Sequence, residues 1–217
     1  MTHNTQPISG LYAVTPDTND TVQLLLQAEA ALKGGVRLLQ YRNKIANKTL
    51  QYTQAKLLLT LCHRYDAKLI INDDINLCIE LGADGVHLGA TDGEIASARQ
   101  ILGADKIIGA SCYNQLDLAR SAQVAGASYA AFGACFVSST KPNAPQAPLS
   151  LFTQAKNELT LPLVAIGGIT LDNAQSVLDA GADAIAVINA LFGAVDITNT
   201  ARLYSQLHSQ LHSQLHS

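Results

Sequence analysis

Charge is scarce in this sequence. Only 14% of its 217 residues are charged, and the formal net charge is −3. Without a basic excess, the chain lacks the usual means of binding nucleic acid or an anionic membrane surface. It also has no apolar run long enough to span a bilayer, and its N-terminus does not resemble a secretory signal. We therefore expect a cytoplasmic protein with no nucleic-acid or membrane partner.

Cysteine motifs are absent as well. The cysteines are widely spaced and form no C-x-x-C pair, so reduced thiols in a cytosolic core are favoured over a disulfide framework or a zinc site. Apolar residues make up 48% of the chain, which argues against disorder and allows a sizeable core. The length suits one domain better than two. The four cysteines are Cys62, Cys78, Cys112 and Cys135.

The chain does contain a regular alternation of two patterns. Short β-branched, apolar runs recur eight times, and a segment with helical periodicity follows each of them. The runs are nearly continuous in apolar residues, as expected of parallel strands that are covered on both faces. The eight runs begin at Leu11, Val36, Lys68, Gly85, Lys106, Tyr129, Leu163 and Ala184.

The helical segments carry start and stop signals. Thr49 is the expected N-cap of the second helix, and Asp92, Asp172 and Asp196 precede three others. Glycines follow several segments and are typical of helix ends. We expect helices over residues 22–33, 50–65, 75–81, 94–102, 116–125, 149–158, 173–180 and from 197 onward.

A four-residue motif recurs where a helix passes into the next strand. It reads LGAD at 81–84 and 102–105, AGAS at 125–128 and AGAD at 180–183. Four copies of one joint indicate a repeated βα unit of about 20 to 25 residues. Eight such units would close into a single-domain (β/α)8 TIM barrel over residues 1–204. The alternative is an open doubly wound sheet, but its glycine-rich fingerprint is missing after the first run.

The last residues, 205–217, form a perfect SQLH repeat. The leucines recur every four residues and could line one face of a helix, and the histidines could bind a metal at the same spacing. We interpret this segment as a low-complexity tail on the last helix rather than as a metal site.

Charged residues gather where the predicted strands end, and the functional loops of a βα barrel lie at these ends. Arg42 and Lys44 follow the second strand at alternate positions, so both can clamp one anion. A solvated pair of loop charges is the alternative. Asp73 follows the third strand and Asp92 the fourth, so they could share a Mg²⁺ with water and substrate oxygens. For Asp74 and Asp92, helix capping is the alternative.

The later strands end in further candidates. Ser111 could donate to a phosphate or satisfy its own backbone. The long loop over 134–148 carries a lysine and three hydroxyls, which suggests an anion-binding lid. Gly167-Gly168 and Ile188-Asn189 follow the seventh and eighth strands, where barrels often bind a phosphate through backbone N–H groups. His87, within the fourth strand, is more typical of a structural residue than of a catalytic one.

In their order and spacing, these motifs resemble those of the thiamine-phosphate synthase family, from about Leu11 to Phe192. The resemblance implies a transferase of thiamine biosynthesis. Such an enzyme joins a hydroxymethylpyrimidine diphosphate to a thiazole phosphate and releases pyrophosphate. The matching motifs are QYRNK (40–44), NDD (72–74), ADGVHLG (83–89) with Asp92, TK (140–141) and IGGI (166–169).

The resemblance also implies roles for single residues. Mg²⁺ would be the cofactor, held by Asp73 and Asp92. The residues implied as catalytic are Arg42, Lys44, Ser111 and Lys141. The diphosphate would be held by Gln40, Arg42, Lys44, Asn72, Ser111 and Lys141, and the thiazole phosphate by Ser138, Thr140, Gly168, Ile188 and Asn189.

Three other functions stay open. A thiazole tautomerase on the same barrel would need the thiazole phosphate site but no diphosphate clamp. A non-catalytic barrel could bind thiamine phosphate without turnover. A phosphate-binding isomerase or epimerase would need an acid/base pair, for which His87 is the candidate. The expected partners are the two phosphorylated small molecules, and a homo-oligomer is left open.

Overall fold

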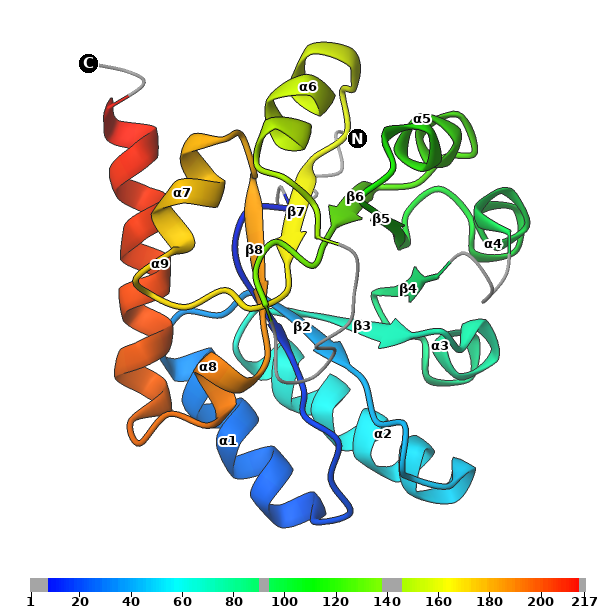
Figure 1. Cartoon of the computed structure of the whole chain (residues 1–217). Helices are drawn as coiled ribbons and strands as arrows, with labels where there is room; N and C mark the ends of the chain where they lie inside the picture. Colours follow the sequence, from blue (N-terminus) through cyan, green and yellow to red (C-terminus); the bar gives the residue numbers. More distant parts are fainter. Residues whose placement is uncertain (1–7, 90–93, 138–145, 215–217) are drawn as a thin grey trace.

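Eight parallel strands close into a barrel, and the helices surround it (Figure 1). The computed structural model describes residues 8–89, 94–137 and 146–214. Each strand pairs with the next along the chain, and the last pairs with the first, so the predicted TIM barrel is confirmed. The strands are β1 (Gly10–Val14), β2 (Leu38–Tyr41), β3 (Lys68–Asn72), β4 (Gly85–Leu88), β5 (Ile107–Tyr113), β6 (Tyr129–Phe132), β7 (Leu163–Ile166) and β8 (Ala184–Val187).

The strands are apolar on both faces because both faces are covered. Leu38 and Ile70 belong to a small cluster inside the barrel. Their chain neighbours Leu39 and Leu69 belong to the large cluster between the sheet and the helices. This double burial explains why the sequence shows continuous apolar runs in place of an alternation.

Helices follow the strands in the predicted order and cover the outside of the barrel (Figure 1). One of them, the short α8, was not expected from the sequence, because four residues are too few to show a helical period. The helices are α1 (Thr21–Lys33), α2 (Lys48–Arg64), α3 (Ile75–Leu81), α4 (Ile95–Leu102), α5 (Leu116–Val124), α6 (Ser150–Glu158), α7 (Ala174–Asp179), α8 (Asn189–Phe192) and α9 (Ile197–Gln214).

Side-chain caps start several helices, and two of the expected ones are wrong. Asn47, not Thr49, caps α2, since its side chain accepts a hydrogen bond from the Leu50 N–H. Asp172 does not cap α7, which begins two residues later and has no side-chain cap. The cap at Asp196 is confirmed by its 2.9 Å bond from the Asn199 N–H. The expected cap at Asp92 lies outside the described residues.

The recurring joint motif has a structural explanation. In three of its four copies the last residue accepts a hydrogen bond from a backbone N–H near the start of the preceding strand. Asp84 accepts from Leu69 at 2.9 Å, and Asp183 accepts from Leu163 at 2.7 Å. Ser128 does the same for β5 at 3.0 Å. The motif therefore links neighbouring strands at the end of the barrel that carries stability rather than function.

This link predicts a stability effect. Asp183→Ala would leave the Leu163 N–H without its side-chain acceptor and should lower the free energy of unfolding by about 1–3 kcal/mol. Asp105→Ala is the matched control, because Asp105 ends its copy of the motif without such a bond among the described residues, and it should change stability by less than about 0.5 kcal/mol. Urea unfolding of both variants measures the difference. Equal losses would contradict the assigned role.

The last helix, α9, packs against α1 and runs across the predicted boundary between residues 204 and 205. Ala201 and Tyr204 are buried, and Leu207 packs against the core. The interpretation of 205–217 as a low-complexity tail stays a prediction. Among the described residues, no helix combines the length and apolar character needed to cross a membrane.

Candidate functional site

A cavity of about 660 Å³ opens at the carboxyl ends of the strands. Its walls come from the ends of β2, β3 and β5 on one side and from the loops after β7 and β8 on the other. The sequence-predicted residues that line it are Gln40, Arg42, Lys44, Asn72, Asp73, Ser111, Gly168, Ile188 and Asn189.

Four predicted site residues lie outside the described part of the chain. They include one of the two expected metal ligands and the lysine of the expected lid. Their proximity to the cavity therefore stays a prediction. The four are Asp92, Ser138, Thr140 and Lys141.

The end of β2 is held by the loop that follows β1. The Thr15 hydroxyl donates to the Arg42 carbonyl at 3.0 Å and accepts from the Arg42 N–H at 2.9 Å. The Asp17 carboxylate accepts from the Arg42 guanidinium at 3.1 Å and from the Lys44 backbone N–H at 2.7 Å. Asp17 thus holds the Arg42 guanidinium and the backbone at Lys44. Asp17 could not be identified from the sequence, because nothing local marks it as a partner of β2.

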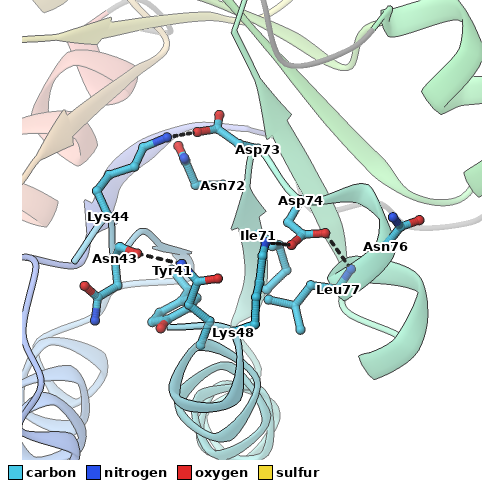
Figure 2. Close-up of a pocket in the computed structure, with 11 residues that line it drawn as sticks. Tyr41, Asn43, Lys44, Lys48, Ile71, Asn72, Asp73, Asp74, Asn76 and Leu77 are labelled. Atoms are coloured by element: carbon cyan, nitrogen blue, oxygen red, sulfur yellow. Dashed lines mark hydrogen bonds and ion pairs between the residues drawn. The ribbon is translucent and has the colours of Figure 1, made fainter. Parts of the chain in front are cut away.

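Lys44 and Asp73 form an ion pair between the loops after β2 and β3 (Figure 2). Asp73 has a φ of 63°, a left-handed conformation that aspartate tolerates better than most residues. Its backbone N–H donates to the His87 carbonyl at 2.9 Å, which ties the β3 loop to β4. The expected anion-clamp lysine and the expected metal ligand are therefore neighbours at the cavity.

Asp74 lies next in the chain but points away from Asp73 (Figure 2). It caps α3 by accepting from the Leu77 N–H at 2.9 Å and pairs with exposed Lys48 at 2.7 Å. Burial acts to raise the pKa of Asp74, but Lys48 and the backbone donors of α3 outweigh it and the pKa is lowered. The capping alternative therefore holds for this carboxylate.

Five polar side chains form a continuous hydrogen-bonded chain through the barrel interior. Gln40 Nε2 donates to Tyr12 Oη at 2.8 Å, and Tyr12 Oη lies 2.8 Å from Tyr129 Oη. His87 Nδ1 lies 2.9 Å from Tyr129 Oη, and His87 Nε2 lies 2.8 Å from Ser111 Oγ. Neither tyrosine, nor the part played by His87, could be predicted from the sequence, because such a hydrogen-bonded chain leaves no local pattern.

The opposite side of the cavity is built from glycines. Gly167 and Gly168 have φ values of 100° and 64°, which glycine adopts without strain. Asn173 holds this turn, since its side chain donates to the Gly168 carbonyl at 3.0 Å and accepts from the Thr170 N–H at 2.9 Å. Gly168 approaches the backbone of Val137 so closely that a side chain would not fit.

Comparison with known proteins identifies a family for this sequence. A family model described as thiamine monophosphate synthase matches residues 11–191. The thiamine-phosphate synthase of Methylobacillus flagellatus is 60% identical over 204 residues, covering 94% of this chain and 97% of the relative. The enzyme of that name from Chromobacterium violaceum is 55% identical over 195 residues, covering 90% and 94%.

Solved structures agree as well. Thiamine phosphate pyrophosphorylase from Pyrococcus furiosus superimposes with a TM-score of 0.83 at 33% identity, covering 93% of this chain and 96% of that one. A geranylgeranylglyceryl phosphate synthase from Thermoplasma acidophilum has a TM-score of 0.72 at 16% identity, covers 94% of both chains and shares the fold. With the family model and the close relatives matching nearly the whole barrel, the chain belongs to the thiamine monophosphate synthase family.

Proposed function

We propose that this chain transfers a hydroxymethylpyrimidine group from its diphosphate to a thiazole phosphate, giving thiamine phosphate and pyrophosphate. The observation that carries the proposal is the meeting of Arg42, Lys44 and Asp73 beside Ser111 at one cavity. This wall of the cavity holds two cations, a carboxylate and a hydroxyl. These are more charged and polar groups than the binding of a single phosphate group requires. They match a metal-bound diphosphate, and this favours the synthase over a thiazole tautomerase.

Mg²⁺ is the proposed cofactor, and the donor set fits it. Mg²⁺ in phosphate sites is commonly held by one or two carboxylates, with water and substrate oxygens completing its shell. Asp73 supplies one carboxylate at the cavity, and Asp92 is the proposed second. No cluster of three or more metal-binding side chains occurs among the described residues, which do not include Asp92. When bound, Mg²⁺ would neutralise negative charge on the diphosphate.

The proposed diphosphate contacts come from the ends of β2, β3 and β5. Arg42 offers a planar fork of donors and Lys44 a mobile ammonium, both suited to phosphate oxygens. Asn72 and Ser111 add uncharged donors at the same wall. The further proposed contacts are Gln40 and Lys141.

The proposed thiazole phosphate contacts lie on the β7–β8 side. Gly168 lets the substrate approach the backbone, and Ile188 and Asn189 stand at the start of α8 beside it. Ser138 and Thr140 would contribute hydroxyls from the loop after β6. This arrangement would separate the two phosphorylated substrates across the cavity and direct their reacting ends toward each other.

The chemistry proposed for the site is a dissociative displacement. The bond between the pyrimidine methylene carbon and the diphosphate oxygen breaks, and its electron pair leaves with pyrophosphate. The same carbon then bonds to the thiazole nitrogen. Arg42 and Lys44 would donate to the oxygens on which negative charge grows, and such preorganised donors lower the barrier. The proposal includes a cytoplasmic location, where buried free thiols such as Cys112 would stay reduced.

Gly168→Ala should weaken the proposed thiazole phosphate site. A Cβ there would lie 2.5 Å from the Val137 carbonyl oxygen and force the loop apart. We expect the KM for the thiazole phosphate to rise at least about tenfold. This corresponds to a loss of about 1.4 kcal/mol or more of binding free energy when the loop at Gly168 is displaced. Gly82→Ala is the control, with a similar φ of 67° but open space around it. It should lower stability by about 1–2 kcal/mol and leave both KM values unchanged.

The direct test of the proposed function is product identification. The purified protein is incubated with Mg²⁺ and both phosphorylated substrates, and thiamine phosphate is sought by chromatography and mass spectrometry. The proposal requires thiamine phosphate only when both substrates are present. Rearrangement of the thiazole phosphate alone would favour the tautomerase. Binding of thiamine phosphate without turnover would favour the non-catalytic barrel.

A further inference from the structure

The hydrogen bonds that link the side chains of Gln40, Tyr12, Tyr129, His87 and Ser111 all run in one direction. A glutamine Nε2 can only donate, so Tyr12 Oη accepts from Gln40. A buried hydroxyl proton without an acceptor is costly, and the remaining contact of Tyr12 Oη among the described residues is Tyr129 Oη, 2.8 Å away, so Tyr12 donates to Tyr129. A hydroxyl oxygen can accept two hydrogen bonds, but the buried proton of Tyr129 also needs an acceptor, and His87 Nδ1 at 2.9 Å is its remaining contact among the described residues. His87 Nδ1 therefore accepts from Tyr129.

The count of protons fixes the far end. A neutral imidazole carries one N–H, and with Nδ1 accepting, that proton sits on Nε2. Nε2 then donates to Ser111 Oγ at 2.8 Å. The four bonds consume one proton each from Gln40, Tyr12, Tyr129 and His87. The hydroxyl proton of Ser111 is left over, and Ser111 lines the cavity.

The surroundings keep His87 in the neutral state that this count needs. The ring is buried, and both of its nitrogens face hydroxyl groups instead of a carboxylate, so a positive charge on the ring would be uncompensated. The ring of Tyr129 stacks on it with centroids 5.6 Å apart. Both rings are therefore fixed in place as well as in charge.

The neighbouring strand leaves room for this arrangement. Gly109 pairs with His87 on one side and with Tyr129 on the other. A Cβ at Gly109 would lie 2.1 Å from the Tyr129 ring and 2.5 Å from His87 Nδ1. The φ of Gly109 is not left-handed, so its backbone conformation does not require glycine. Glycine is needed here because a side chain would collide with Tyr129 and His87.

We propose that Tyr12, Tyr129 and His87 are positioning residues that hold the Ser111 hydroxyl as a hydrogen-bond donor toward the cavity. Ser111 would then meet the diphosphate with a proton instead of a lone pair, and an anion requires that orientation. The identity of this anion rests on the proposed function. Each hydrogen bond depends on the one before it. If the oxygen and nitrogen of the Gln40 amide exchanged places, every donor and acceptor would be reversed, and Ser111 would direct a lone pair toward the cavity.

The tautomer of His87 tests this inference without any turnover. Long-range ¹H–¹⁵N spectra of histidine-labelled protein distinguish the two neutral tautomers, and the signal missing from a His87→Gln variant identifies the residue. The proposal requires the Nε2–H tautomer in the wild-type protein. The Nδ1–H tautomer would mean that the chain runs the other way and would overturn the proposal, whatever reaction the protein catalyses.

A double-mutant cycle tests the functional consequence. Tyr129→Phe removes the hydroxyl in the middle of the chain and should lower kcat about tenfold, while Ser111→Ala should lower it about 100-fold. If Tyr129 acts through Ser111, Tyr129→Phe should have no further effect in the Ser111→Ala background. Multiplied effects would show that Tyr129 is merely structural and would overturn the proposal.

The matched control is Tyr41→Phe, which removes another buried hydroxyl from the opposite face of β2. Tyr41 Oη donates to Gln54 at 2.8 Å and is not part of the chain. This variant should leave the His87 tautomer and kcat unchanged. A wild-type protein with the Nε2–H tautomer but no synthase activity would refute the proposed reaction and leave the hydrogen-bond direction standing.

Discussion

Asp73→Asn is expected to lower kcat by about 10²- to 10³-fold, the size of effect seen when one preorganised electrostatic contact is removed. The amide keeps the shape of the side chain, and asparagine adopts the left-handed backbone found at this residue. The fold should therefore survive. The negative charge that faces Lys44 and the proposed Mg²⁺ would be lost. Pyrophosphate release over a Mg²⁺ series should show a higher requirement for the ion.

Asp74→Asn is the matched control for this variant. Asparagine is a good N-cap, so α3 should keep its start, and the lost pair with exposed Lys48 is worth little. Turnover and Mg²⁺ dependence should stay close to those of the wild-type protein. If the two variants behaved alike, or if Asp73→Asn kept the wild-type Mg²⁺ dependence, the metal assignment at Asp73 would be wrong.

Arg42→Gln is the second change with a large expected effect. It removes the fork of donors proposed for the diphosphate and frees Asp17, which pairs with Arg42 in the structure. We expect kcat/KM for the pyrimidine diphosphate to fall by about 100-fold or more, as for a lost charged contact at a developing anion. The KM for the thiazole phosphate should hardly change, because its proposed site lies on the β7–β8 side.

Arg37→Gln is the matched control for Arg42→Gln. It shows whether the fall in kcat/KM comes from Arg42 itself or would follow the loss of another arginine next to β2. Arg37 precedes the strand at its amino end and donates to the backbone carbonyls of Leu32 and Val36. Its replacement should cost stability and leave steady-state kinetics unchanged, since that end of the barrel lies opposite the site. Steady-state assays with each substrate varied in turn measure both variants. A similar rise in the KM of both substrates in Arg42→Gln would place Arg42 outside the diphosphate clamp.

The strands could be predicted from the sequence because barrel strands are buried on both faces. Strands β3 and β7, with the sequences KLIIN and LVAI, begin at the predicted residues Lys68 and Leu163. Helix starts were less predictable. Asn47 and Thr49 are both good capping residues two positions apart, and only the bond from the Leu50 N–H decides between them.

The lining of the cavity could be predicted where its residues follow strand ends directly. Arg42, Lys44 and Asp73 stand in short motifs whose order along the chain is recognisable. Asp17 and Tyr129 could not be found in this way. They act through partners that are far away in sequence, 25 and 42 residues distant for their bonds to Arg42 and His87, and only barrel closure brings them together.

The most direct test of the central claim is pyrophosphate release by the purified wild-type protein, followed with each substrate and Mg²⁺ omitted in turn. Release is expected only when both substrates and Mg²⁺ are present, with one thiamine phosphate formed for each pyrophosphate. Release that needs no thiazole phosphate, or no release from folded protein that still binds the thiazole phosphate, would contradict it.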